Sequence, residues 1–317
     1  MGQSVFKKMT TVFLSNQECN KHINPVGHPE QVGRLITIEK ILSTNQFKGL
    51  KKVEARIGHY EDILEVHSKS YLKDISEKCS SITQTFIDGD TVVNKNSLPA
   101  ALYGVGAITE AIDLVVQGTF TNAFCATRPP GHHAEKDLAM GFCLFGNVAI
   151  GAKYALKKDK INKVAILDFD VHHGNGTQNL LWDEKNILFI STHQMPLFPG
   201  SGSKNETGAF DNILNLPLSE GSDGNSYLKL MERQIIPRIE TFDPDLIMIS
   251  AGFDAHEDDP LASLNWTSED YYTITKKMCF LAEKLCQKRI VSSLEGGYNL
   301  KALGESVALH VKALMEE

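Results

Sequence analysis

Short apolar runs alternate along the chain with longer stretches of helical periodicity. Six short, mainly apolar runs predict strands, at residues 10–14, 122–126, 163–168, 187–191, 246–250 and 290–294. Amphipathic stretches predict helices, at residues 30–43, 98–117, 142–157, 227–241, 269–287 and 300–315. This alternation favours an α/β fold with a doubly wound, mainly parallel sheet flanked by helices. Several runs are almost continuously apolar, so their strands should be covered on both faces.

The alternation continues without a break that would mark a linker. The chain has 317 residues and shows no internal repeat, low-complexity tract or segment rich in Pro, Gly and Ser between its elements. We therefore expect a single domain over residues 1–317, in which residues 1–8 could form a flexible extension. Two segments rich in Gly, Ser and acidic residues, 198–212 and 256–265, are expected to be long surface loops.

Polar segments follow four of the predicted strands. They lie at residues 128–133, 168–172, 250–256 and 294–298. In an open parallel sheet, ligands bind beyond the carboxyl ends of the strands, so these segments should meet at one edge. The sequence therefore predicts a functional site there.

Two of these segments offer ligands for a metal ion. Asp170 and His172 stand two residues apart, so in extended chain their side chains point to the same face. Asp254 is the natural third ligand, and three protein groups leave one position of a zinc ion open, as in catalytic sites. An isolated Asp-x-His triplet is more often a hydrogen-bonded loop. The metal prediction therefore depends on the other segments.

Further side chains could carry the chemistry. His132 and His133 can act as bases near neutral pH, and Asp168 and Asn175 could orient them, with the pairing left open. Tyr298 follows two glycines and could donate a hydrogen bond to an oxyanion. The alternatives are a satisfied histidine turn and a core or rim tyrosine. Phe142 and Phe198 could line a slot for an alkyl chain, although a single Phe is more often a core residue.

Composition narrows the class of protein. A formal net charge of −7 argues against tight, sequence-independent nucleic-acid binding, which needs many Lys and Arg side chains. No stretch approaches the roughly 20 apolar residues of a membrane span, and the first residues do not form a signal peptide. The six cysteines show no C-x-x-C spacing, so we expect them to be reduced thiols. They are at positions 19, 79, 125, 143, 279 and 286. A soluble cytoplasmic protein is expected.

Five short motifs in order resemble the zinc-dependent histone deacetylase family, which has the arginase–deacetylase fold. They are RPPGHHA (128–134), MGFC (140–143), LDFDVHHGNGTQ (167–178), SAGFDAH (250–256) and LEGGYNL (294–300). The resemblance extends from HPEQVGR (28–34) to about residue 310, nearly the whole chain. The LEGGYNL ending and Asn175 resemble the class II branch of the family.

The resemblance implies roles for the polar residues. Asp170, His172 and Asp254 match the ligands of one zinc ion. His133 matches the general acid–base group that takes a proton from the attacking zinc-bound water, and His132 matches its electrostatic neighbour. Tyr298 matches the residue that polarises the scissile carbonyl. Asp168 and Ser191 match two ligands of a structural potassium ion, whose other ligands are backbone carbonyls.

The resemblance also implies a substrate tunnel. Gly141, Phe142 and Phe198 match the walls of a tunnel for acyl-lysine, and Asp90 matches a loop carboxylate that grips the substrate backbone. Arg34 matches an arginine near the inner acetate cavity. Leu261 stands where polyamine-selective members carry Glu, and so resembles the acyl-lysine enzymes.

These residues predict a zinc hydrolase that removes acetyl groups from lysine side chains of proteins or peptides. One alternative is a deacetylase of acetylpolyamines or other small acetylated amines. An acidic cleft mouth at residues 257–259 could favour cationic substrates of either kind. Another alternative, of a different class, is an inactive scaffold that binds acyl-lysine. No direct nucleic-acid or membrane partner is expected, and the sequence leaves the oligomeric state open.

Overall fold

The protein is described by a computed structural model covering residues 11–81 and 83–316. The expected extension at residues 1–8 lies outside this range. Eight parallel strands form one sheet in the order β2–β1–β5–β10–β9–β6–β7–β8. They are β1 (Thr11–Ser15), β2 (Lys51–Glu54), β5 (Asn122–Cys125), β6 (Val164–Asp168), β7 (Ile187–Gln194), β8 (Ile213–Leu218), β9 (Leu246–Ala251) and β10 (Ile290–Leu294). All six predicted strands are present, and the two unpredicted ones, β2 and β8, form the edges.

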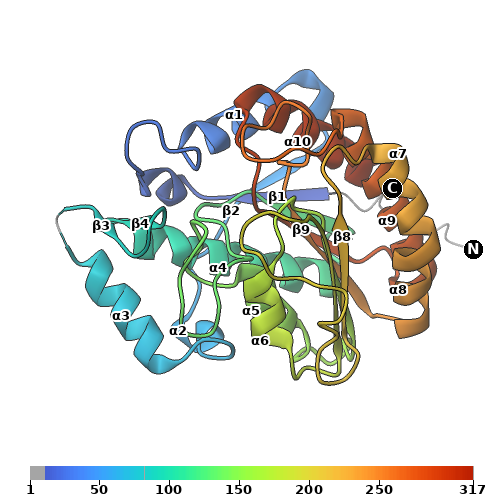
Figure 1. The fold of residues 1–317 in the computed structure, drawn as a ribbon, viewed down its shortest axis with the longest axis horizontal. Helices are drawn as coiled ribbons and strands as arrows, with labels where there is room; N and C mark the ends of the chain where they lie inside the picture. The colour runs from blue at the N-terminus through green and yellow to red at the C-terminus, as the bar shows by residue number, and fades with distance from the viewer. Residues whose placement is uncertain (1–10, 82, 317) are drawn as a thin grey trace, which may run out of the picture.

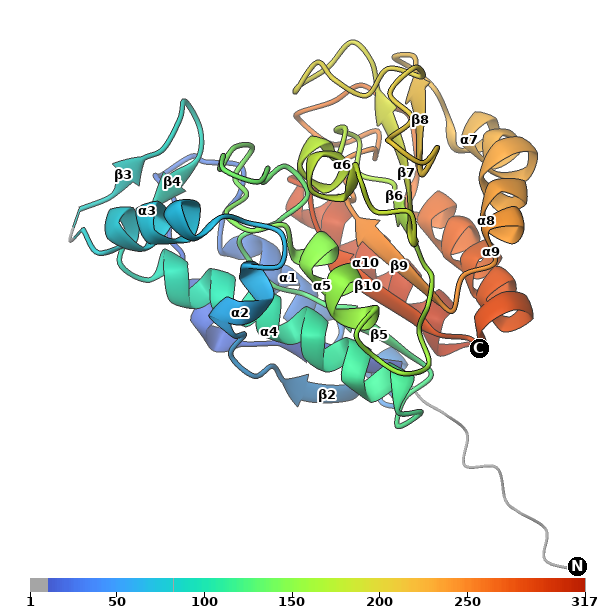
Figure 2. The same ribbon diagram turned by 90° about the horizontal axis from the view of Figure 1, so that it is seen from below.

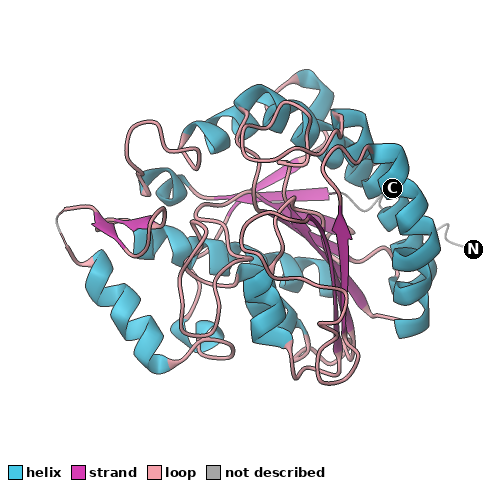
Figure 3. Cartoon of the chain, in the orientation of Figure 1, coloured by secondary structure: helices cyan, strands magenta, loops and turns pink. Residues whose placement is uncertain are grey.

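Helices cover both faces of this sheet (Figures 1 and 3). One face packs against α1 (Gly33–Ile41), α7 (Gly224–Leu230), α8 (Ile236–Phe242), α9 (Ser268–Cys286) and α10 (Leu300–Met315). The other face packs against α4 (Ser97–Val116), α5 (Asn147–Ala155) and α6 (Asn175–Leu181), and Figure 2 shows α4 and α5 on the near side of the sheet. The predicted α/β fold with a doubly wound parallel sheet is confirmed.

Strand side chains alternate between two apolar cores. In β9, Ile247 and Ile249 belong to the core under α9 and α10, whereas Leu246 and Met248 belong to the core under α4 and α5. Both sets are fully buried. This two-sided burial explains why the central strands have almost continuous apolar sequences.

A smaller group of elements lies beside the main sheet, at the left of Figure 1. It contains α2 (Tyr60–Ile63), α3 (Lys69–Cys79) and the antiparallel pair β3 (Thr85–Phe86) and β4 (Val92–Val93). These elements pack on α4 and on the chain before α5 in a third apolar cluster. Three short helices complete the fold: the 3₁₀ helices η1 (Gln17–Lys21) and η2 (Asn45–Phe47), and the π-helical η3 (Met231–Ile235).

Two predicted helices differ in their details. The helix expected from residue 142 begins at Asn147, because Gly141 and Phe142 have positive φ angles of 54° and 68° that a right-handed helix does not accept. The helix expected at 227–241 consists of α7, η3 and α8, which follow one another without a gap. All six cysteines are free and buried, consistent with the expected thiols.

One helix corrects the expectation about membrane-length segments. Among the described residues, α4 is long and apolar enough to cross a membrane, with a mean hydropathy of 1.4. However, 72% of this apolar window is buried inside the protein. Ile108, Ala111 and Ile112 of α4 belong to the core against the sheet. The apolar character of α4 is therefore that of a central core helix.

Candidate active site

The four innermost strands of the sheet carry the predicted site. β5, β10, β9 and β6 are neighbours, and the chain leaves each of them at the same edge because all four are parallel. The segments that follow them contain the histidine pair, Tyr298, Asp254 and the Asp170–His172 segment, respectively. The convergence expected from the sequence is present.

Asp170, His172 and Asp254 form a buried group that could hold a metal ion. One ligand atom from each residue lies within 4.8 Å of the other two. Nδ1 of His172 is 3.1 Å from Oδ1 of Asp170 and 3.2 Å from Oδ2 of Asp254. Two carboxylate oxygens and one imidazole nitrogen are ligands that zinc accepts, and a fourth position would stay open.

The surroundings of these carboxylates fit a cation. Oδ2 of Asp254 is buried and accepts no hydrogen bond, so its polar contact is the 3.2 Å approach of Nδ1 of His172. The other oxygens are fixed by backbone amides: Val171 N–H donates to Oδ1 of Asp254 over 2.9 Å, and Gly296 N–H donates to Oδ2 of Asp170 over 2.8 Å. The carboxylates are thus held in place with one oxygen free for a ligand.

The electrostatics of the group also favour positive charge. Burial alone would lower the pKa of His172, but Asp170 and Asp254 outweigh it and raise this pKa to about 10. Burial, followed by the charge of Asp170, raises the pKa of Asp254. Two carboxylates at one buried point therefore need a cation between them, which a metal ion can supply.

The structure assigns a different partner to each histidine of the pair. Nδ1 of His132 lies 3.1 Å from Oδ2 of Asp168, and Nδ1 of His133 lies 2.7 Å from Oδ1 of Asn175. The ring centroids of His132 and His133 are 3.9 Å apart. Both orienting residues were predicted, and the pairing that the sequence left open is now defined.

The two imidazoles differ in the charge that they favour. Burial alone would lower the pKa of His132, but Asp170 and Asp168 raise it well above its usual value. Burial lowers the pKa of His133 well below its usual value, and His132 and His172 lower it further. A charged His132 therefore lies beside a neutral His133, which can accept a proton.

A cavity of about 610 Å³ opens onto this group. His133 and His172 lie on its lining, and so do six other predicted site residues: Asp90, Gly141, Phe142, Phe198, Leu261 and Tyr298. The Phe198 ring is 5.1 Å from the His133 ring, and the Phe142 ring is 5.8 Å from the Tyr298 ring, both edge to face. The cavity thus joins apolar walls to the polar group.

Residues 28–314 of the chain match the histone deacetylase domain. The chain belongs to the histone deacetylase family. It is 38% identical to histone deacetylase 14, chloroplastic, of Arabidopsis thaliana, over 93% of this chain and 74% of that protein. It is 36% identical to a probable deacetylase of Archaeoglobus fulgidus, over 92% of this chain and 82% of that protein.

A solved structure supports the same conclusion for the fold of this deacetylase. The crystal structure of the HDA15 HD domain is similar with a TM-score of 0.92 and 31% sequence identity, over 98% of this chain and 89% of that one. The arginase–deacetylase fold implied by the sequence motifs is therefore confirmed. By family, the protein is a deacetylase and thus a hydrolase.

Arg34 lies behind Tyr298 in the deacetylase and is not among the residues that line the cavity. Its guanidinium carbon is 5.1 Å from the Tyr298 ring centroid. It donates hydrogen bonds to the backbone oxygens of Gly297, over 2.7 Å, and of Glu295. Arg34 therefore supports the loop that carries Tyr298.

The predicted potassium ligands are neighbours in the sheet. Asp168 and Ser191 pair in register across β6 and β7, and both are fully buried. Ser191 Oγ lies 3.0 Å from Nδ1 of His193, and Oδ1 of Asp168 accepts a hydrogen bond from the Asp170 N–H over 3.1 Å. The structure thus places the two side chains on adjacent strands.

One part of the predicted acidic mouth is wrong. Asp259 is only 7% exposed and points inward, where Oδ2 accepts the Tyr298 N–H over 2.7 Å and Oδ1 accepts the Leu261 N–H over 3.0 Å. Burial raises the pKa of Asp259 to about 7, with a further contribution from Asp254. Glu257 and Asp258 are exposed but do not line the cavity.

Sequence reasoning also missed two buried carboxylates that hold the site loops. Oε2 of Glu295 accepts the backbone N–H groups of Gly131, over 2.7 Å, and of His132, over 3.1 Å. Glu30 pairs with Arg34 over 3.2 Å and with Arg128, whose Nη2 is 2.6 Å from Oε2. The available signal was Glu beside motif residues, but sequence alone does not show burial.

Proposed function

We propose that this protein is a zinc-dependent deacetylase of acetyl-lysine side chains in proteins or peptides. The observation that carries the proposal is the cavity, which brings His133, Tyr298 and His172 of the metal-binding group to the end of an apolar channel. When bound, a zinc ion would supply a Lewis acid that polarises a carbonyl and lowers the pKa of a water ligand. The remaining chemistry would come from the chain's own side chains.

His133 is the proposed general base. Its Nδ1 is occupied by Asn175 and its ring lines the cavity, so Nε2 is the atom available for proton transfer. The lowered pKa of His133, caused first by burial, keeps it neutral and ready to accept a proton. His132, held by Asp168, would contribute positive charge beside it and help a proton to reach the leaving amine.

Tyr298 is the proposed donor to the substrate carbonyl. Burial raises the pKa of its hydroxyl well above the usual value, so the proton stays available for donation. Its backbone N–H is anchored by Asp259, and Arg34 supports its ring. A donor held in advance stabilises the charge that develops on oxygen.

The channel fits the side chain of acetyl-lysine. Phe142 and Phe198 would enclose the aliphatic part of the substrate, while Asp90 near the opening could accept backbone N–H groups. Gly141 has a φ of 54°, and an added Cβ would lie 2.4 Å from Cδ2 of His133. A side chain at position 141 would therefore push into the catalytic histidine.

A direct test combines metal analysis with turnover. The purified protein should contain one zinc ion per chain and cleave a fluorogenic acetyl-lysine peptide, and a chelator should abolish the activity until zinc is restored. Binding of the acetylated peptide with no turnover in the zinc-loaded protein would instead support the inactive scaffold.

Leu261 distinguishes the lysine side chain from small acetylated amines. Leu261 lines the cavity and is uncharged, so a polyamine ammonium group finds no carboxylate at position 261. We expect Leu261→Glu to raise kcat/KM for acetylspermidine relative to the peptide by about 10-fold, the effect of one added charge contact. A panel of acetylated peptides and polyamines measures the ratio. If the unaltered protein already prefers acetylpolyamine, the acetyl-lysine assignment is wrong.

Three further predictions belong to this proposal. Asp168 and Ser191 would hold potassium together with nearby backbone carbonyls, which titration of the zinc-loaded protein with K⁺ can test.

Asn175 and the sequence of residues 294–300 support placement in the class II branch. A cytoplasmic location is also proposed, on the basis of the buried free cysteines.

A further inference from the structure

Asn175 lies between the general base and a carboxylate that has no role in the chemistry described above. Oδ1 of Asn175 is 2.7 Å from Nδ1 of His133, and Nδ2 of Asn175 donates to Oε1 of Glu135 over 2.7 Å. The Asn175 side chain thus joins His133 on one side to Glu135 on the other.

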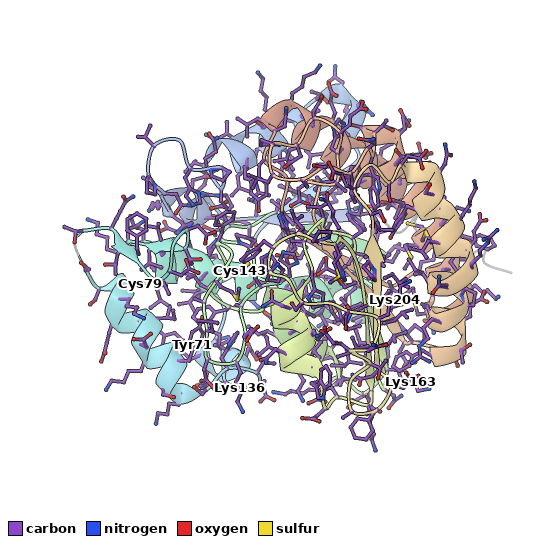
Figure 4. The ribbon with its side chains drawn as sticks, in the orientation of Figure 1. Tyr71, Cys79, Lys136, Cys143, Lys163 and Lys204 are labelled. Carbon is purple, nitrogen blue, oxygen red and sulfur yellow. The ribbon has the colours of Figure 1, made fainter. Side chains whose placement is uncertain are left out.

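The carboxylate belongs to a different part of the protein surface. Glu135 is half-buried and lines a second cavity of about 650 Å³, which shares no lining residue with the substrate cavity. Figure 4 labels Cys143 in the interior of the fold and Lys136, next to Glu135, nearer its lower edge. Glu135 therefore lies outside the substrate cavity.

An asparagine presents an orientation problem that an aspartate does not. Its amide can point either oxygen or nitrogen toward a neighbour, and the two orientations have nearly the same shape. With oxygen toward His133, Nδ1 of the imidazole carries the hydrogen and Nε2 keeps its lone pair. With nitrogen toward His133, Nδ1 must accept, so the hydrogen moves to Nε2 and the neutral ring no longer offers a base to the cavity.

A carboxylate at Glu135 removes this ambiguity. An ionised carboxylate only accepts hydrogen bonds, so it selects the orientation in which the Asn175 NH₂ faces it. The sulfur of Met140, 3.3 Å from Nδ2, is also an acceptor and favours the same orientation. His132 needs no second residue to orient its partner, because the carboxylate of Asp168 accepts through either oxygen.

We propose that Glu135 is a positioning residue that fixes the amide of Asn175 and thereby the base-competent tautomer of His133. The inference rests on the proposed function in that His133 is the base. The effect of Glu135 depends on the residue at position 175, because an amide there needs its orientation fixed and a carboxylate does not.

The test is a double-mutant cycle between these two positions, measured on the zinc-loaded protein with the acetyl-lysine peptide. Glu135→Ala should lower kcat by about 10- to 100-fold, the usual effect of removing an orienting partner, with KM changed less than about twofold. Glu135→Gln should recover only part of the rate, because its amide can present either its oxygen or its NH₂ group to Asn175. In the Asn175→Asp background, Glu135→Ala should cause no loss, because either carboxylate oxygen accepts from His133.

A matched control removes another carboxylate from the same cavity. Glu65 lines it and pairs with Lys157 over 2.7 Å. Glu65→Ala should leave kcat unchanged. An equal loss on Glu135→Ala in the Asn175 and Asn175→Asp backgrounds would overturn the proposal, because it would show a general structural role for Glu135.

The tautomer can also be read without turnover. In ¹⁵N-histidine-labelled protein, the His133 signals should show Nδ1–H in the unaltered chain and a shift toward Nε2–H in Glu135→Ala, with Nδ1–H restored by Asn175→Asp. This NMR result separates the two proposals, since it holds even if the peptide proves not to be a substrate. An unchanged His133 tautomer in Glu135→Ala would overturn the positioning role.

Discussion

Glycines determine how closely the backbone approaches the carboxylates of Asp170 and Asp254, the candidate metal ligands. A Cβ on Gly296 would lie 2.0 Å from Oδ2 of Asp254 and 2.5 Å from Oδ2 of Asp170. A Cβ on Gly252 would lie 2.0 Å from Oδ2 of Asp170. These distances are far below van der Waals contact, so neither position has room for a side chain beside the carboxylates.

Gly296→Ala should therefore weaken metal binding. The added methyl group must displace the two carboxylates, and we expect zinc affinity to fall by about 10- to 100-fold, as for other changes that misplace ligands. Competition with a chromophoric chelator measures the affinity. Gly49→Ala is the control, because its Cβ would make an ordinary 3.5 Å contact with Met315. Equal zinc affinities for the two variants would contradict the proposed ligand set.

Tyr298→Phe tests the hydroxyl while keeping the ring. The ring contacts with Phe142 and Arg34 should persist, so substrate binding should change little. Loss of one hydrogen-bond donor to a developing oxyanion should lower kcat by about 100-fold or more. Steady-state kinetics with the acetyl-lysine peptide provide the measurement. An undiminished kcat would remove Tyr298 from the mechanism.

At the scale of elements, buried ion pairs connect the loops that carry the site. Glu30, just before α1, is fully buried and pairs with Arg128 after β5 and with Arg34 of α1. Burial alone would raise the pKa of Glu30, but Arg128 and Arg34 lower it to about 2. Because Arg34 also bonds the backbone of Gly297, one carboxylate links the histidine segment to the Tyr298 segment.

Glu30→Ala should strongly destabilise the fold. It leaves two buried guanidinium groups without their carboxylate, which typically costs about 3–5 kcal/mol in the free energy of unfolding. Urea denaturation at pH 7 measures the loss. The control is Glu77→Ala, which removes an exposed pair with Lys73 and should cost less than about 0.5 kcal/mol. Similar losses for the two variants would mean that the buried pairs do not stabilise the loops.

The sequence predicted the central strands and missed the edges for a physical reason. A central strand such as β6 has both faces covered, so its first four residues, Val-Ala-Ile-Leu, are all apolar. The edge strand β2 is Lys-Lys-Val-Glu and mostly exposed, and β8 is interrupted by Asn215 and Pro217. Edge strands have no continuous apolar signature, because neighbours cover less of their surface.

The candidate site was predictable where residue type alone limits the chemistry. Asp170, His172 and Asp254 were found in this way, and the structure brings them together. Asp259 was misplaced at an acidic mouth, because three successive acidic residues suggest solvent exposure, whereas its inward direction depends on the backbone of Tyr298. The contact of Glu135 could not be predicted, since its side chain pairs with an amide 40 residues away in the sequence.

At the scale of the whole molecule, a buried histidine joins several elements. His310 of α10 is fully buried, with Nδ1 2.7 Å from Thr275 Oγ1 of α9 and Nε2 2.9 Å from Ser292 Oγ of β10. Burial lowers its pKa to about 3. Burial similarly lowers the pKa of His22 and of His67, each to about 4. These residues are neutral in the folded protein at pH values where unfolded chains are protonated.

Stability should therefore fall as the pH drops below about 6.5. Between this value, which is typical of unfolded histidine, and the folded pKa of about 3, unfolding takes up one proton at His310. Each such site makes stability fall by about 1.4 kcal/mol per pH unit. His310→Gln should make the slope shallower by this amount between about pH 5.5 and 4, measured by urea denaturation at each pH. The exposed His59→Gln is the control, and identical slopes for the two variants would contradict the assignment.

The order of strands in the sheet has a consequence for protein synthesis. β10 lies between β5 and β9 in the sheet, although it is the last of the described strands to be synthesised and β5 precedes it by more than 160 residues. A nascent chain that has reached Asp254 contains all three candidate metal ligands, but β10 and the segment bearing Tyr298 have not yet been made. Domains generally fold as units, so the two parts of the sheet on either side of β10 cannot join before that strand has been made. The arrangement thus delays hydrolysis until nearly all of the domain has been translated.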